Sequence, residues 1–102
     1  MKFFTWSNET NQRLKIERNI SFEEVVYYIE KGQILDIVQN PNSAKYKDQK
    51  ILIVDINDYA SLVPFLEKDE EVVLITIIPS RKATRKYLRG GDEYKRNQPR
   101  RS

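Results

Sequence analysis

The chain has 102 residues, with 18 lysines and arginines against 15 aspartates and glutamates, and it has neither cysteine nor histidine. This length fits one domain. The missing residue types exclude disulfides, a thiolate nucleophile, cysteine or histidine zinc sites and the commonest general base. Any catalysis therefore depends on lysine, arginine, tyrosine or carboxylates.

Positive charge is concentrated in the last part of the chain. Residues 81–102 hold nine basic and two acidic residues, a formal charge of +7, whereas residues 1–80 hold nine basic and thirteen acidic residues, a formal charge of −4. This separation predicts that one end of the molecule meets a polyanion, with nucleic acid as the leading candidate. The alternative is a solvated tail that binds nothing.

The first third of the chain predicts a short strand and two helices. Aromatic residues 3–6 form the strand, and Ser7 caps a helix that ends at Asn19, which tolerates a left-handed backbone. Ser21-Phe22-Glu23-Glu24 is a capping-box pattern, and apolar residues then recur at helical spacing until Gly32.

The next part predicts four strands, at residues 34–38, 50–56, 59–66 and 72–78. Asn57-Asp58 is the tight turn of a hairpin between the second and third. The last run is apolar at odd and even positions, so both its faces should be covered. Pro64 predicts an edge position or a kink. Helices followed by strands predict an α+β fold, with two N-terminal helices on a four- or five-stranded antiparallel sheet.

Ser80 is placed to cap a last, basic helix over residues 81–89, before Gly90-Gly91. Like charges one turn apart repel each other, but they become favourable beside phosphates. We therefore expect a single domain at residues 1–90 and a flexible basic tail at 91–102.

Aromatic residues accompany the basic ones, which suits single-stranded RNA, because tyrosine stacks on a base while lysine or arginine holds the backbone. Trp6 is either such a platform or a core residue. The RNA-binding candidates are Trp6, Tyr46, Lys47, Lys82, Lys86 and Arg89.

The chain has only three glycines and no glycine-rich phosphate loop, and its acidic pairs have no histidine beside them, so we expect no cofactor and no metal. The chemistry left open is the attack of an RNA 2′-hydroxyl on its own phosphate. In this reaction Arg81 and Arg85 would stabilise negative charge, and Tyr87 or Lys50 would carry protons.

Three blocks of the sequence resemble the BrnT family of type II toxins. They are Phe4-Thr5-Trp6-Ser7 with Asn11, then residues 20–25, and residues 77–84, which include Arg81-Lys82-Ala83-Thr84. The resemblance implies a compact RelE-like ribonuclease that arrests translation. It also implies a hetero-oligomer with an antitoxin encoded beside it, commonly a ribbon-helix-helix DNA-binding protein.

By this resemblance Trp6 matches the family's first aromatic residue and Arg81 the arginine that opens the terminal motif, while Arg85 and Tyr87 fall at polar positions of its helix. The family often has Lys-His-Gly between its first helices, where this chain has Glu17-Arg18-Asn19. The missing histidine and lysine leave open a weak or inactive member.

Two other functions fit the same residues. One is a nucleic-acid-binding module without catalysis, and the other is an interaction protein with an apolar sheet face covered by a partner. The sequence has no long apolar segment, which predicts a cytoplasmic protein without a membrane partner.

Overall fold

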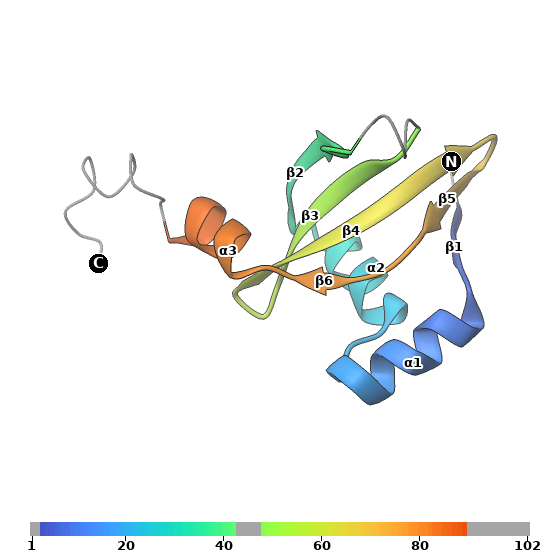
Figure 1. The fold of residues 1–102 in the computed structure, drawn as a ribbon, viewed down its shortest axis with the longest axis horizontal. Coiled ribbons are helices and arrows are strands. Elements are labelled where there is room, and N and C mark those ends of the chain that lie inside the picture. Colours follow the sequence, from blue (N-terminus) through green and yellow to red (C-terminus); the bar gives the residue numbers. More distant parts are fainter. Residues whose placement is uncertain (1–2, 43–47, 90–102) are drawn as a thin grey trace.

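Three helices and six strands make up a compact α+β domain in the computed structural model, which describes residues 3–42 and 48–89 (Figure 1). The elements are β1 (Phe3–Trp6), α1 (Asn8–Arg18), α2 (Phe22–Glu30), β2 (Ile34–Gln39), β3 (Lys50–Ile56), β4 (Tyr59–Lys68), β5 (Glu71–Leu74), β6 (Ile78–Pro79) and α3 (Arg81–Leu88). No helix within the described ranges is long and apolar enough to cross a membrane. The predicted tail at 91–102 lies outside these ranges.

The predicted starts and ends of α1 and α2 are confirmed. Ser7 Oγ accepts a hydrogen bond from the Thr10 N–H at 3.3 Å, and Asn19 ends α1 with a left-handed φ of 56°. Ser21 and Glu24 form the reciprocal capping box of α2. Local sequence therefore fixes both helices.

The buried side chain of Asn11 joins these two helices. Its Oδ1 accepts the N–H of Phe22 at 2.8 Å, and its Nδ2 donates to Glu23 Oε1 at 2.9 Å. The hydrogen bond that Asn11 donates to Glu23 lowers the pKa of the Glu23 carboxyl. A buried amide with both ends satisfied sets the angle between the helices.

The sheet is mixed and open, with strand order β1-β5-β4-β3-β2 and β6 beside β4. The predicted hairpin of β3 and β4 is confirmed, and its turn residues Asn57 and Asp58 have positive φ angles of 55° and 67°. The prediction of a purely antiparallel sheet with four or five strands is wrong. β1 pairs in parallel with β5 because the helices and the hairpin carry the chain across the sheet between them.

Pro64 explains why the run at 72–78 forms two strands, β5 and β6, rather than the single strand predicted. The Pro64 carbonyl accepts a hydrogen bond from Ile75 N–H at 2.9 Å, so its backbone polar atoms face this neighbouring segment. Proline has no N–H and so cannot donate a second hydrogen bond to this segment. The hydrogen bonding with β4 is therefore interrupted between Leu74 of β5 and Ile78 of β6. β4 itself runs unbroken through Pro64 in the interior of the sheet.

Helices lie against both faces of the sheet. Leu52, Val54 and Ile56 of β3 join a buried cluster with Leu14 and Phe22 on one side, which we call the α1–α2 face. The alternate residues Ile51 and Ile53 join a smaller cluster with Ala60 and Ala83 on the other side, the α3 face. In Figure 1, α1 and α2 lie together below the sheet, and α3 lies at the end far from β1 and β5.

Candidate nucleic-acid interface

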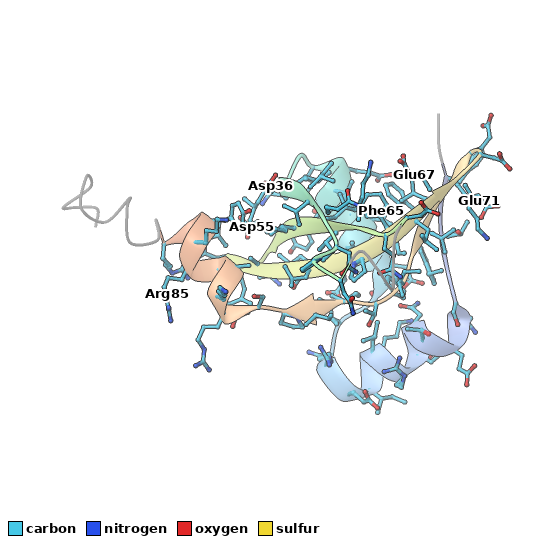
Figure 2. The ribbon with its side chains drawn as sticks, turned by 45° about the horizontal axis from the view of Figure 1, so that its top comes forward. Asp36, Asp55, Phe65, Glu67, Glu71 and Arg85 are labelled. Atoms are coloured by element: carbon cyan, nitrogen blue, oxygen red, sulfur yellow. The ribbon has the colours of Figure 1, made fainter. Side chains whose placement is uncertain are left out.

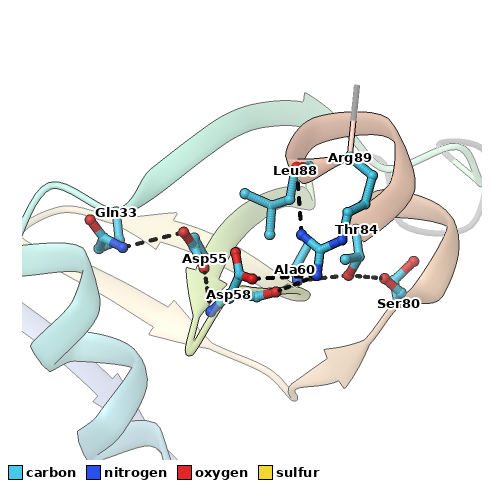
Figure 3. A network of polar contacts seen from close by, with 8 residues as sticks. All are labelled: Gln33, Asp55, Asp58, Ala60, Ser80, Thr84, Leu88 and Arg89. Carbon is cyan, nitrogen blue, oxygen red and sulfur yellow. Dashed lines mark hydrogen bonds and ion pairs between the residues drawn. The ribbon is translucent and has the colours of Figure 1, made fainter. Parts of the chain in front are cut away.

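The first turn of α3 is fixed to the sheet by hydroxyl groups. Ser80 Oγ caps the helix by accepting the N–H of Ala83 at 3.0 Å. The buried Thr84 Oγ1 accepts the N–H of Ala60 in β4 at 2.8 Å and donates to the Ser80 carbonyl at 2.7 Å (Figure 3). The Ala83-Thr84 pair thus docks the helix, with the small alanine allowing close approach.

The other end of α3 is held by Arg89. Its guanidinium lies 3.4 Å from the Asp58 carboxylate and donates to the Asp58 carbonyl, also at 3.4 Å. The Asp58 N–H in turn donates to Asp55 Oδ1 at 2.9 Å (Figure 3). The predicted RNA-binding residue Arg89 is therefore in an ion pair with Asp58, although this pair is exposed and weak.

Arg81 and Arg85 lie one turn apart on the outer surface of α3 and are exposed. Neither makes an ion pair or hydrogen bond with another residue in the described part of the chain. Figure 2 shows Arg85 directed outward at the α3 end, with Glu67 and Glu71 at the opposite end of the molecule. The structure thus leaves two guanidinium groups open to a ligand.

A shallow hollow of about 200 Å³ lies beside α3, where the helix meets the sheet. Its apolar lining, which we call the floor, comes from Ile53, Leu62 and Ala83. Ile53 and Ala83 are only 4% and 7% exposed, so Leu62 offers most of the accessible apolar surface. Its rim carries Ser80, Lys82, Lys86 and Tyr87. The two lysines lie on the side of the helix that faces the hollow, whereas Arg81 and Arg85 lie on the outer side.

Tyr87 is held at this rim by Asp36 of β2. The tyrosine hydroxyl donates to Asp36 Oδ2 at 2.7 Å, and Asp36 Oδ1 accepts the N–H of Ile37 at 2.8 Å. The bond from Tyr87 lowers the pKa of the Asp36 carboxyl, and the bond to Asp36 raises the pKa of the Tyr87 hydroxyl. Lys86 Nζ lies 5.2 Å from the centre of the Tyr87 ring. At neutral pH Tyr87 is therefore a protonated donor.

The chain has no match among protein-family models, curated proteins or solved structures. The resemblance to the BrnT family stays a prediction that rests on the quoted sequence blocks. The site is defined by the geometry of α3, the hollow and Asp36.

Of the four predicted catalytic residues, the structure places Arg81, Arg85 and Tyr87 on α3 and separates Lys50 from them. Lys50 is the first residue of β3 and lies at the end of the strand away from the β3–β4 turn. α3 docks near that turn, where Arg89 pairs with Asp58. Strand alternation directs its side chain to the α1–α2 face, because Ile51 faces α3. In this structure Lys50 is therefore separated from Tyr87 and the other residues of α3.

The predicted RNA-binding residues divide in the same way. Lys82, Lys86 and Arg89 lie on or directly after α3, whereas Trp6 stacks on Phe22 with ring centroids 5.6 Å apart and packs against the α1–α2 cluster. Trp6 is partly buried against this cluster, which agrees with the core alternative, and base stacking by Trp6 stays a prediction. Tyr46 and Lys47 lie outside the described residues.

Sequence reasoning assigns no role to Asp36, because a single carboxylate in a strand carries no functional motif by itself. The available signal was a single carboxylate inside the apolar run Ile34-Leu35-Asp36-Ile37-Val38. It also missed the apolar floor from Ile53 and Leu62, since their meeting with α3 depends on the order of strands in the sheet.

Proposed function

We propose that the domain binds RNA through α3 and acts as a metal-independent endoribonuclease, the toxin of a type II toxin–antitoxin system of the BrnT kind with a RelE-like fold. The observation that carries the proposal is the docked helix α3. It holds Arg81, Arg85 and Lys82 exposed and without partners among the described residues, beside the protonated Tyr87. Cations held on a rigid helix favour phosphate contacts, because each contact releases a counterion.

The distribution of charge supports one direction of approach. Exposed Glu67, Asp69, Glu70 and Glu71 surround the turn between β4 and β5, at the end of the molecule remote from α3 (Figure 2). A field that is negative at one end and positive at the other orients a polyanion before contact. RNA would thus arrive at α3 and avoid the tip of the β4–β5 hairpin.

The reaction would form a bond from the RNA 2′-oxygen to phosphorus while the bond to the 5′-oxygen breaks. Arg81 and Arg85 would stabilise the additional negative charge on the phosphate. Tyr87 would turn its hydroxyl from Asp36 to donate a proton to the departing 5′-oxygen, and the 2′-hydroxyl proton would leave to water. The raised pKa keeps Tyr87 protonated before the reaction but also makes it a weak acid. Asp36 would position Tyr87, and Lys82 and Lys86 would hold neighbouring phosphates.

A cytoplasmic hetero-oligomer with a ribbon-helix-helix antitoxin belongs to the same proposal through the sequence resemblance. An RNA-binding module without catalysis is the second candidate. This second candidate is favoured by two observations: Lys50 lies far from α3, and the Tyr87 hydroxyl already donates its hydrogen bond to Asp36. The two candidates share the α3 surface and differ only in cleavage.

The experiment incubates the purified full chain with single-stranded RNA in the presence of a chelator, at several salt concentrations. Arg81→Ala and Arg85→Ala should each reduce the salt slope of binding by about one, because each removes one phosphate contact. Tyr87→Phe should keep binding and slow cleavage by about 100-fold or more. Lys15→Ala, a charge-matched change on exposed α1, should alter neither.

Each possible result of this experiment supports or contradicts one of the two candidate functions. Binding without cleavage by the parent chain would support the non-catalytic module. Absence of binding, or equal salt slopes for Arg81→Ala, Arg85→Ala and the parent, would contradict the α3 proposal altogether.

A further inference from the structure

The hollow beside α3 has an apolar floor that phosphate binding does not need. Ile53 and Leu62 are a cross-strand pair on the α3 face of β3 and β4, and Ala83 closes the floor from the helix. Water in such a site meets few polar partners, so a flat apolar group that displaces it gains free energy.

The rim of the same hollow attracts negative charge. Lys82 and Lys86 lie one turn apart on its border, and Lys82 has no ion pair or hydrogen bond with the residues that the structure describes. Lys86 lies over the Tyr87 ring, and its charge also contributes to lowering the pKa of Asp36. A small apolar ring with an adjacent anion matches this combination of floor and rim.

Size restricts the ligand further. The hollow measures about 200 Å³, whereas pockets for drug-sized molecules measure about 300–1,000 Å³. It can hold one ring system while the rest of the ligand lies outside. A base inside a duplex is stacked on both faces and paired along one edge, so it cannot enter, and the ligand is single-stranded.

We infer that the hollow between α3 and strands β3 and β4 is a nucleobase subsite, which holds one unstacked base against Leu62 while Lys82 and Lys86 bind the flanking phosphates. This inference rests on the proposal that α3 binds RNA, and it adds base contact to charge contact. It makes recognition depend on a base at one position of the strand, whatever the outcome for catalysis.

The test compares two single-stranded RNAs of equal length, one intact and one lacking a single central base. Basic residues outside the hollow contribute equally to both, so the affinity ratio isolates the base. The full chain should prefer the intact RNA by about fivefold to 100-fold, the range for one stacked base. Leu62→Phe, which fills the hollow, should remove this preference, and Lys82→Ala should weaken both RNAs while keeping it.

A second measurement follows the methyl NMR signals of Ile53 and Leu62 during titration with adenosine monophosphate and with ribose 5-phosphate. Only the nucleotide should shift these methyl signals. The same titration of the Lys82→Ala variant should show the same base-dependent shifts, so the test does not depend on whether Leu62→Phe folds. Equal affinity for both RNAs, or methyl signals that ignore the base, would overturn the subsite while RNA binding stands. Absence of RNA binding with base-dependent methyl shifts would instead support the subsite and contradict the proposed function.

Discussion

The two faces of the sheet are built differently. On the α1–α2 face, large side chains such as Phe22, Leu14 and Leu74 are almost fully buried, and the polar Asn11 has its partners within the same face. On the α3 face, small residues such as Ala60 and Ala83 meet, and hydroxyl groups and one carboxylate hold the helix. The first face stabilises the fold, and the second holds charged groups at the surface.

This difference has an energetic cause. Burial of apolar area contributes about 25 cal/mol per Å², so the face with large side chains carries most of the stability. A helix that keeps its cations exposed can bury only a narrow stripe. α3 therefore depends on two hydrogen bonds with neighbouring strands, one that Thr84 accepts from the Ala60 N–H and one that Tyr87 donates to Asp36, which fix its position although they bury little area.

The largest expected effect is on the α1–α2 face. Phe22→Ala should lower the free energy of unfolding by about 3–5 kcal/mol, because Phe22 is fully buried and stacks on Trp6. Urea denaturation measures the change. Phe3→Ala is the matched control, since Phe3 is 63% exposed, and it should cost under about 1 kcal/mol. Similar losses from both variants would show that this face is not the main core.

An intermediate effect is expected on the α3 face. Thr84→Val keeps the shape of the side chain and removes the hydroxyl, which leaves the N–H of Ala60 without its partner. The expected loss is about 1–3 kcal/mol in the free energy of unfolding, with faster amide exchange at Ala60 and in α3. Thr84→Ser retains the hydroxyl and should recover most of the loss. A protected Ala60 amide in Thr84→Val would contradict the tether.

Sequence reasoning worked where structure depends on neighbouring residues. Ser7, Asn19 and Ser21 act within a few positions of themselves, and Asn57-Asp58 needs only its own backbone, so these features were predicted correctly. The parallel pairing of β1 with β5 was not predicted, because strands so distant along the chain leave no local signal of their pairing.

The candidate site divides in the same way. The basic helix and its Ser80 cap were readable from the sequence, because charge and capping are local patterns. The bond from Tyr87 to Asp36 joins residues 51 positions apart and depends on where β2 lies in the sheet. The sequence left Trp6 as either a stacking platform or a core residue, and its contact with Phe22, which depends on the tertiary fold, supports the core alternative.

The smallest effect is expected from the bond between Asp36 and Tyr87, and it depends on pH. The pKa of Asp36 is lowered from its ordinary 3.8, so its contribution to stability is complete above that value and is lost as pH falls through the lower, folded pKa. The pKa of Tyr87 is raised from 10.0, so its contribution is complete below that value and is lost at higher pH.

Asp36→Asn should therefore bring the pKa of Tyr87 back toward 10.0, because the negative partner is removed while an amide oxygen remains to accept the hydroxyl. NMR titration of the Tyr87 ring measures this, and thermal unfolding between about pH 3 and about pH 5 should show a smaller acid loss than in the parent. Part of the acid loss should persist, since Glu23 also has a lowered pKa. Asp48→Asn, an exposed aspartate in a turn, is the control and should leave the Tyr87 titration unchanged. A Tyr87 pKa that does not respond to Asp36→Asn would mean that the two side chains are apart in solution, and α3 would then lose its tie to β2.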